Sequence, residues 1–272
     1  TYSNALDLFC SHGLKIVGVE TDGEGMQVQS LEGVLQQHHP RLIYTIANFQ
    51  NPTGACLSGP RRRSLIALSE RYNVPIIEDD FVGDLRYEGR AQPALKALDG
   101  NGNVIYVSTF SKMLMPGLRV GFLVADGPVY RHLVRLKLTD DFATSNLMQR
   151  AVESFVSVGR YRSHLRSTRH LYRRRRDAIL LAVRQHLPRE ARPLVPQGGL
   201  FLWLELPDRA SAHRLLPLAR ERGVLFAPGG GFFLSRSDGD RFLRLNFAAW
   251  EEDEITTGVA RLGKAFEKLG SR

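Results

Sequence analysis

The sequence is poor in cysteine and has no long apolar run. Only 2 of its 272 residues are cysteine, Cys10 and Cys56, and neither stands in a CxxC or metal-ligand spacing. Such sparse thiols argue against a disulfide framework or a cysteine-ligated metal site and are typical of a reducing compartment. No apolar run has the length of a membrane span, and no basic-then-apolar leader opens the chain. We therefore expect a cytoplasmic protein without a bound metal.

Acidic residues are fewer than basic ones, and the formal net charge is +9. Much of the excess lies in residues 160–176, where arginines recur at steps of four and three and so share one helix face. A solvated basic side of an amphipathic helix explains this stripe. Contact with nucleic acid is the alternative, but no zinc finger, helix-turn-helix or RNP pattern accompanies it. The arginines of the stripe are Arg162, Arg166, Arg169, Arg173 and Arg176.

Short apolar runs alternate with helical patterns in the first part of the chain. This order predicts an α/β fold with a mostly parallel sheet, helices on both faces and right-handed crossovers. Strands are predicted over residues 14–19, 42–46, 74–77, 103–107 and 121–125, and helices over residues 4–13, 31–37, 58–72, 128–138, 145–156 and 160–187.

A smaller α+β domain is predicted to follow. Pro188, Pro193 and Pro196 end the long helix. Strands are then predicted over residues 199–206, 224–227 and 242–247, with helices near residues 211–222 and 255–266 and a turn at residues 228–231. We accordingly predict a large domain over residues 1–165 and a small C-terminal domain over residues 166–272.

The stretch STFSKMLMPGLRVGF, residues 108–122, carries the most informative chemistry. Lys112 follows a buried strand, where a lysine can be desolvated and made nucleophilic. Thr109, Ser111 and Arg119 suit a phosphate dianion, because a guanidinium binds it bidentately and stays charged. An imine-forming lysine beside a phosphate clamp indicates pyridoxal phosphate. The alternative is an ordinary surface lysine with Arg119 in a structural ion pair.

Polar residues also close two earlier strands. Asn51 lies in a turn-rich loop after residues 42–46, and Asp79 follows residues 74–77. The carboxyl ends of parallel strands meet at one edge of a sheet, so Asn51, Asp79 and Lys112 are expected to face one crevice. A buried carboxylate needs a partner, and a protonated pyridine nitrogen would supply one. An ion pair or a helix cap is the alternative for Asp79. Pro52 follows Asn51 in a tight loop and is a candidate for a cis peptide bond.

With these residues assembled, the chain resembles the fold-type I pyridoxal-phosphate aminotransferases of class I/II. It is most similar to the branch that contains 2-aminoadipate and kynurenine aminotransferases and the aminotransferase-like domain of MocR-type regulators of the GntR family. The resemblance rests on NPTG at residues 51–54, EDD at 78–80, SK at 111–112 with PGLR at 116–119, GGLFLW at 198–203 and LRLN at 243–246.

The resemblance implies a role for each of these residues. Lys112 would carry pyridoxal 5'-phosphate as an aldimine and later move a proton at the substrate α-carbon. Asp79 would bind the pyridine nitrogen, Asn51 the ring hydroxyl, and Thr109, Ser111 and Arg119 the phosphate. Tyr2 would stack on the ring, Arg244 would bind the substrate carboxylate, and Gly198 and Gly199 would line the substrate mouth.

Two departures from the family pattern stand out. Relatives place a tyrosine two or three residues after the pyridine aspartate, where this chain has Phe81 and Val82; Tyr87 is a candidate substitute. The Gly-rich turn that grips the phosphate in this family would lie upstream of Tyr2, outside this sequence.

The resemblance implies an aminotransferase that moves the amino group of an α-amino acid to a 2-oxo acid, as a homodimer. An effector domain of a MocR-type transcriptional regulator, with little or no catalysis, is the alternative; nucleic acid would then bind to an upstream domain. A lyase or decarboxylase using the same cofactor is a third possibility. The substrate side chain is not predicted.

Overall fold

The computed structural model describes residues 1–270 and divides the chain into two compact units. Unit 1 comprises Thr1–Gly18, Phe49–Ala55 and the chain from His170 onward. Unit 2 comprises Val19–Asn48 and Cys56–Arg169. Segments that are distant in sequence therefore build unit 1.

Unit 2 is built on a four-stranded sheet with the order β3-β4-β5-β6. The strands β3 (Ile43–Thr45), β4 (Ile76–Asp79) and β5 (Val104–Thr109) run parallel, and β6 (Gly121–Val124) pairs antiparallel with β5. The predicted α/β class with a mostly parallel sheet is confirmed.

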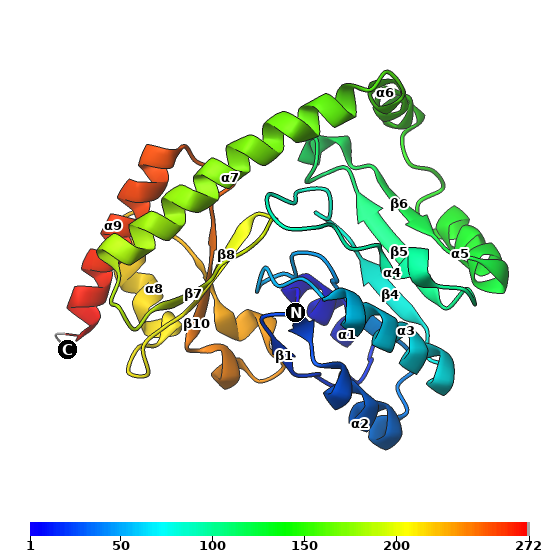
Figure 1. Cartoon of the computed structure of the whole chain (residues 1–272), viewed down its shortest axis with the longest axis horizontal. Helices are drawn as coiled ribbons and strands as arrows, with labels where there is room; N and C mark the ends of the chain where they lie inside the picture. The colour runs from blue at the N-terminus through cyan, green and yellow to red at the C-terminus, as the bar shows by residue number, and fades with distance from the viewer. Residues whose placement is uncertain (271–272) are drawn as a thin grey trace. The chain divides into compact units, whose positions relative to one another are not determined.

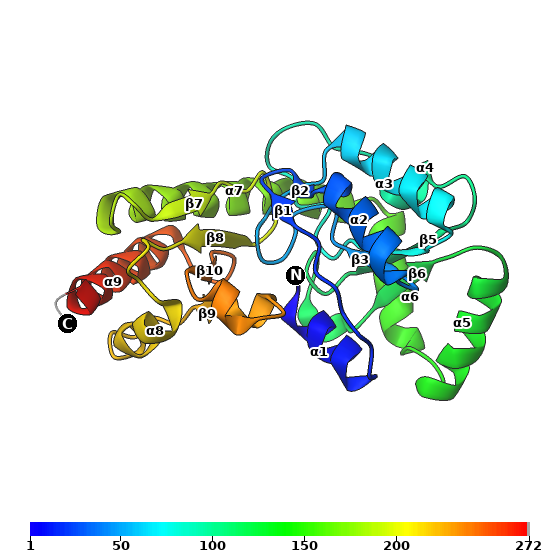
Figure 2. The ribbon, with the colours of Figure 1, turned by 90° about the horizontal axis from the view of Figure 1, so that it is seen from below.

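Helices lie on both sides of this sheet (Figure 2). In Figure 2, α2 (Val28–His38), α3 (Gly59–Tyr72) and α4 (Leu95–Leu98) lie together on one side of the strands, and α5 (Gly127–Asp140) lies on the other side. Leucines of the first three helices pack against Ile43, Ile76 and Val104 of the sheet. Removing this apolar surface from water is the main stabilising contribution to unit 2. The remaining elements of unit 2 are β1 (Thr21–Asp22), β2 (Gly25–Met26), the 3-10 turn η1 (Pro116–Leu118), α6 (Asn146–Ser157) and the first part of α7 (Arg160–His186).

Unit 1 contains a second four-stranded sheet, with the order β7-β8-β10-β9. β10 (Phe242–Asn246) runs antiparallel to both β8 (Phe201–Glu205) and β9 (Ala227–Pro228), and β7 (Arg192–Leu194) pairs antiparallel with β8. Figure 1 shows α8 and α9 beside this sheet. The helices and turns of unit 1 are α1 (Ser3–Ser11), the part of α7 from His170, α8 (Ala212–Arg220), η2 (Gly229–Phe232), η3 (Arg236–Gly239) and α9 (Glu252–Gly270).

Several local predictions were wrong. Residues 14–19 form no strand, because an extended apolar segment needs a neighbouring strand to complete its hydrogen bonds, and none pairs with it among the described residues. Residues 224–226 are also outside any strand. The turn predicted at residues 228–231 is present, as the 3-10 turn η2 over residues 229–232. The arginine stripe is not solvated throughout, because Arg176 is buried and donates to the Pro196 carbonyl at 2.9 Å.

Two further features concern the whole described chain. Neither Cys10 nor Cys56 forms a disulfide within residues 1–270. None of the helices in this range combines the length and the apolar character that crossing a membrane requires.

Candidate functional site

The consecutive carboxylates Glu78, Asp79 and Asp80 at the end of β4 lie in different surroundings. Glu78 is fully buried and accepts hydrogen bonds from the backbone N–H groups of Leu95 (2.8 Å) and Lys96 (2.9 Å), at the start of α4. Asp80 accepts from Asn48 Nδ2 (3.1 Å) and from the Tyr106 hydroxyl (2.7 Å). Glu78 and Asp80 thus hold the helix and loop that follow the strands. Asp79 is left for another role.

Asp79 lies on the other face of the sheet. It accepts one hydrogen bond, from the Tyr44 hydroxyl to its Oδ2 at 2.6 Å. Within residues 1–270, no lysine, arginine or histidine forms an ion pair with Asp79. Burial raises the pKa of Asp79, the Tyr44 hydrogen bond lowers it and the Asp80 charge raises it; the net direction is upward. A partly buried carboxylate without a cation can stabilise a positively charged nitrogen that a ligand brings.

Lys112 lies in a turn directly after β5. The turn is closed by a backbone hydrogen bond from Leu114 N–H to the Phe110 carbonyl (2.9 Å), and its flanking residues Ser111 and Met113 are buried. Lys112 itself is exposed rather than desolvated. Nothing within residues 1–270 holds its ammonium by a hydrogen bond or an ion pair. The amine is therefore accessible to a carbonyl compound.

Hydroxyl groups and Arg119 surround the same turn. Thr109 Oγ1 accepts from the Ser111 N–H (3.1 Å) and donates to the Val120 carbonyl (3.2 Å), so it ties the start of the turn to its end. Arg119 precedes Val120 in a left-handed backbone conformation, with φ of 52°, and its side chain is exposed. The predicted phosphate-binding residues Thr109, Ser111 and Arg119 thus belong to one closed loop.

The start of α7 supports this loop. His164 Nε2 lies 2.8 Å from the Met113 carbonyl, next to Lys112. The Phe110 and Tyr161 rings meet edge-on with centroids 6.0 Å apart, and the Tyr161 hydroxyl donates to Asp84 at 2.7 Å. Burial raises the pKa of Tyr161, followed by the Asp84 contact. This helix therefore fixes both the lysine loop and the loop that follows Asp79.

In unit 1, Arg244 is held between two aromatic rings. Its guanidinium carbon lies 4.0 Å from the Phe201 ring centroid and 4.9 Å from that of Phe232. Its Nη1 donates to Asn51 Oδ1 at 2.5 Å, whereas its buried Nε has no hydrogen-bond partner among the described residues. Burial lowers the pKa of Arg244, and Tyr2 raises it. No carboxylate of the described residues neutralises Arg244, so it can bind an anionic group of a ligand.

The remaining predicted residues of unit 1 lie near this arginine in the chain or in space. Asn51 contacts Arg244 directly, and the Asn51–Pro52 peptide bond is cis, as the sequence suggested. Gly199, with φ of +79°, stands two residues before Phe201, in a conformation that favours glycine. Unit 1 thus collects Tyr2, Asn51 and Arg244, and unit 2 collects Asp79, Thr109, Ser111, Lys112 and Arg119.

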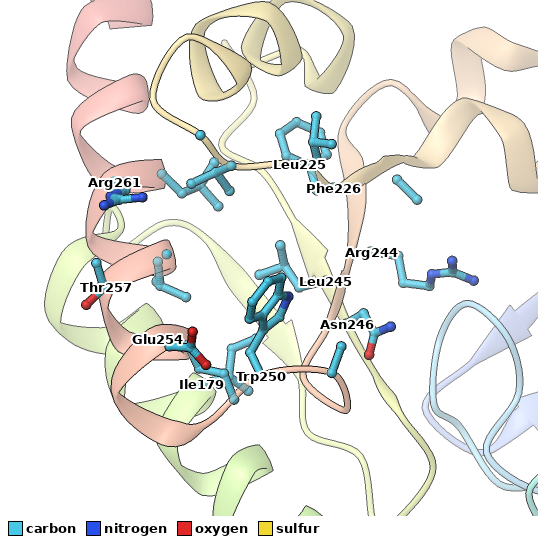
Figure 3. Close-up of a pocket in the computed structure, with 18 of the residues that line it drawn as sticks. Ile179, Leu225, Phe226, Arg244, Leu245, Asn246, Trp250, Glu254, Thr257 and Arg261 are labelled. Atoms are coloured by element: carbon cyan, nitrogen blue, oxygen red, sulfur yellow. The ribbon is translucent and has the colours of Figure 1, made fainter. Parts of the chain in front are cut away.

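Arg244 and Leu245 of β10 both line a hollow of about 850 Å³ that also borders Trp250 and α9. Figure 3 shows the side chains of Arg244 and Asn246 pointing away from those of Leu245 and Trp250. Side chains alternate along this strand, since Leu243, Leu245 and Phe247 are all buried. The hollow therefore borders the candidate site at Arg244.

Two residues that hold the site were missed from the sequence. They are Tyr44 and His164. Each sits in an apolar or basic run where its type is unremarkable. Only the register β3–β4 could have pointed to Tyr44, because it pairs with Ile77, two residues before Asp79.

These residues fit pyridoxal phosphate. Asp79 and Thr109 lie on one face of neighbouring strands, because Asp79 pairs with Val107 and side chains alternate along β5. The set offers a carboxylate without a cation, hydroxyls and a guanidinium beside one loop, and an accessible amine. Those are the groups that a pyridine nitrogen, a phosphate and an aldehyde require.

A mostly parallel sheet whose strand ends carry an acid, hydroxyls and a lysine, together with a half-buried arginine in unit 1, is typical of the fold-type I transferases. Residues 1–262 match the family Aminotransferase class I and II, and the chain belongs to this family. The predicted resemblance is confirmed.

Two relatives and one solved structure illustrate the range of this family. The chain is 35% identical to the aromatic-amino-acid aminotransferase 1 of Thermococcus litoralis over 98% of its own length, and it spans 65% of that protein. It is 32% identical to the HTH-type transcriptional regulator YisV of Bacillus subtilis, covering 99% of this chain and 55% of the regulator. The crystal structure of LysN, the α-aminoadipate aminotransferase of Thermus thermophilus, complexed with N-(5'-phosphopyridoxyl)-L-leucine, matches with a TM-score of 0.95 and 36% identity, over 100% of this chain and 70% of that one.

Proposed function

We propose that this chain is part of a pyridoxal-phosphate-dependent aminotransferase that moves the amino group of an α-amino acid to a 2-oxo acid. The observation that carries the proposal is the arrangement in unit 2. Lys112 is accessible and lies in a closed loop with the hydroxyls of Thr109 and Ser111. Asp79 lies at the end of the adjacent strand and forms no ion pair within the described residues. The aminotransferases among its relatives support the same assignment.

Each residue has a defined task in this proposal. Asp79 binds the protonated ring nitrogen, and Thr109, Ser111 and Arg119 bind the phosphate. When bound, the cofactor acts as the electron sink that acidifies the substrate α-carbon. Lys112 holds the cofactor and then accepts and returns the proton at that carbon.

The residues of unit 1 complete the assignment. Arg244 binds the substrate carboxylate, because its guanidinium has fixed planar geometry and no acid beside it. Asn51 binds the ring hydroxyl, Tyr2 stacks on the ring and Gly199 lines the substrate mouth. These roles follow the family resemblance, with Asn51 and Arg244 already in contact.

The test is a reduction experiment on the purified chain. After incubation with pyridoxal phosphate, borohydride reduction should fix the cofactor on Lys112, as located by peptide mass spectrometry. Lys112→Ala should abolish both the label and the cofactor absorbance. Equal labelling of the variant would contradict the assignment. Amino transfer to 2-oxoglutarate, measured against release of carbon dioxide, then separates a transaminase from a decarboxylase.

A second candidate is an effector domain of a transcriptional regulator. It is favoured by the HTH-type regulators among the relatives, to which the chain is 32% identical in one case. An effector domain would bind the cofactor and an amino acid, seen as a spectral change, without releasing a 2-oxo acid. Chromatographic detection of the 2-oxo acid after a single turnover distinguishes the two functions.

A homodimer and a cytoplasmic location are further parts of this proposal. They rest on the family resemblance and on the sparse cysteines of the sequence. Sedimentation of the purified chain tests the first, and fractionation of the source cells tests the second.

A further inference from the structure

Tyr44 and Asp79 form a side-chain pair across two neighbouring strands of unit 2. The Tyr44 hydroxyl donates to Asp79 Oδ2 at 2.6 Å, in a partly buried position. In the parallel register of β3 and β4, Tyr44 lies opposite Ile77, which is two residues before Asp79. Since side chains two residues apart share a face, Tyr44 and Asp79 lie on the same side of the sheet.

A second tyrosine–aspartate pair occupies the opposite face. The Tyr106 hydroxyl donates to Asp80 Oδ2 at 2.7 Å, and Asn48 Nδ2 donates to Asp80 Oδ1 at 3.1 Å. Both oxygens of Asp80 are therefore engaged inside the protein. Asp79 accepts only at Oδ2, and no other described residue donates to its Oδ1. Of these two adjacent carboxylates, Asp79 alone keeps an oxygen for a ligand.

The groups around Asp79 explain why such a pair is useful. Tyr44 faces it from β3, and Asp80 is the charged group that follows it on its own chain segment. β5 presents apolar Val107 opposite Asp79. Burial and the Asp80 charge raise the pKa of Asp79, whereas the Tyr44 hydroxyl lowers it. A hydrogen bond from Tyr44 therefore favours the ionised carboxylate in a place where its surroundings oppose ionisation.

We infer that Tyr44 is a positioning residue, which fixes the Asp79 carboxylate by its Oδ2 and presents the ionised Oδ1 to a protonated ring nitrogen. This inference rests on the proposed function for its ligand. Tyr44 contacts Asp79 and acts through it.

The test compares Tyr44→Phe with Tyr106→Phe in the intact chain. Each substitution removes one hydroxyl from one tyrosine–aspartate pair and leaves the ring. The Asp79 pKa is measured without cofactor by a carbon-13 NMR titration of labelled aspartates, with Asp79→Asn to assign the signal. We expect Tyr44→Phe to raise the Asp79 pKa and Tyr106→Phe to leave it unchanged. The dissociation constant for pyridoxal phosphate should rise about tenfold in Tyr44→Phe and stay unchanged in Tyr106→Phe. A tenfold change corresponds to the loss of about one charge-assisted hydrogen bond.

Two failures remain separable. An Asp79 pKa that is the same in wild type and Tyr44→Phe would overturn the inference, whatever the cofactor does. If Tyr44→Phe shifts that pKa but the wild-type chain takes up no pyridoxal phosphate, the proposed function and the ligand of Oδ1 are overturned, and the pairing itself stands. Thermal unfolding of both variants ensures that the Asp79 pKa is compared between folded proteins. If Tyr44→Phe is unfolded, a fluorinated tyrosine at position 44 replaces it in the test. Its hydroxyl is more acidic, so it should lower the Asp79 pKa.

Discussion

At the residue scale, the cage around Arg244 limits what unit 1 can bind. Two phenylalanine rings flank the guanidinium, and Asn51 holds one of its nitrogens. The rings restrict the arginine side chain and exclude water from its faces, so the binding edge is fixed before a ligand arrives. A planar anion such as an α-carboxylate suits this edge, because a guanidinium can donate two parallel hydrogen bonds to it.

Substitutions in this cage should affect substrate binding in graded steps. Arg244→Lys should raise KM for the amino acid by roughly ten- to a hundredfold, because it removes a bidentate contact worth about 1.5–3 kcal/mol. Phe232→Leu keeps the guanidinium and loses one ring, at about 0.5–1 kcal/mol, so KM should rise by only about two- to fivefold. Steady-state kinetics over a series of amino acids measures both effects.

Phe233→Leu is the matched control for this series. Phe233 is the next residue in the chain and stacks on Phe242 at 5.7 Å and on Trp203 at 6.4 Å, with no ring contact to Arg244 among the described residues. We expect an unchanged KM. If Phe233→Leu and Phe232→Leu raised KM equally, the rings would act through the fold of unit 1 and not on the arginine.

Sequence reasoning identified the chemical residues better than the residues that support them. Lys112, Asp79 and Arg244 stand out because a charged residue at or within an apolar strand needs a partner. Tyr44, Phe201 and Phe232 carry no such signal, since tyrosine and phenylalanine are common in strands and cores. Their role depends on which strands are neighbours and in which register, and one sequence does not specify either. The sequence left open whether Lys112 is desolvated or exposed, because that depends on how the whole loop closes.

At the scale of elements, the glycine-rich turn η2 is shaped by a close backbone approach. A Cβ on Gly229 would lie 2.4 Å from the Gly239 carbonyl oxygen of η3 and 2.7 Å from Phe242 Cβ. Gly229→Ala should therefore lower the free energy of unfolding by about 1–3 kcal/mol, as overpacking does. It should also raise KM, because η2 ends in Phe232. Denaturant unfolding and kinetics on the same sample check both expectations.

Gly231→Ala provides the comparison within the same turn. Nothing lies within 4 Å of a Cβ at this position, and its backbone is outside the left-handed region. We expect stability equal to wild type or higher by about 0.4–1 kcal/mol, because alanine restricts the unfolded chain more than glycine does. A loss as large as that of Gly229→Ala would show that the turn needs glycine for flexibility rather than for space.

The loop before β5 depends on one buried carboxylate. Asp99 has a fully buried side chain and accepts hydrogen bonds from the N–H groups of Val104 (2.9 Å), Asn103 (3.0 Å) and Asn101 (3.2 Å), and from Lys96 Nζ (2.9 Å). Burial raises the pKa of Asp99, but Lys96 and these N–H groups together lower it by more. The net direction is therefore downward from 3.8. Asp99→Asn should cost about 1–3 kcal/mol at neutral pH.

The pH dependence gives this prediction its sign. A carboxylate with a lowered pKa in the folded state contributes stability above its unfolded pKa and loses it as the pH falls through the folded value. The difference in stability between wild type and Asp99→Asn should therefore be constant near neutrality and shrink below pH 3.8, where protonation begins in the unfolded chain. Denaturant titrations across this range measure it. A difference independent of pH would show that the charge of Asp99 is unimportant.

The strands that sequence reasoning missed share a physical cause. β7 has three residues, one of them proline, and β9 has two, so neither carries a periodic pattern. Both pair with longer strands, β8 and β10, which were predicted. Conversely, residues 14–19 have strand-like residues but no neighbouring strand among the described residues. Strand formation therefore followed tertiary pairing more than local preference.

At the scale of the whole molecule, unit 1 joins segments that a linear division of the sequence separates. Residues 49–55 belong to unit 1, although the strand before them belongs to unit 2. Local periodicity contains no information on such long-range contacts, whereas it does predict the layers of each unit. The division into domains at residues 165 and 166 stays a prediction. The class of fold was predictable because alternating strands and helices leave few arrangements.

An exposed apolar surface on unit 2 yields the last prediction. Tyr130, Val134 and Leu138 recur every four residues on α5 and are 51%, 40% and 58% exposed, and the helix has no buried residue. In β6, Phe122, Leu123 and Val124 are exposed as well. Exposed apolar side chains in such number mark an interaction surface or lead to association. We expect the purified chain to self-associate, and Val134→Glu with Leu138→Glu to weaken association at least about tenfold, because the charges would be desolvated in the contact.

The control adds the same charge elsewhere on the helix. His132 and Thr139 are exposed and lie outside the stripe of Tyr130, Val134 and Leu138, so His132→Glu with Thr139→Glu changes the net charge similarly and keeps the apolar side chains. Sedimentation velocity over a range of concentrations should then distinguish two causes. If only the stripe variant stays monomeric, apolar contact drives association. If both variants lose self-association equally, electrostatic repulsion explains the result, and the stripe is an ordinary exposed surface. A wild-type chain that is monomeric at every concentration would contradict the prediction directly.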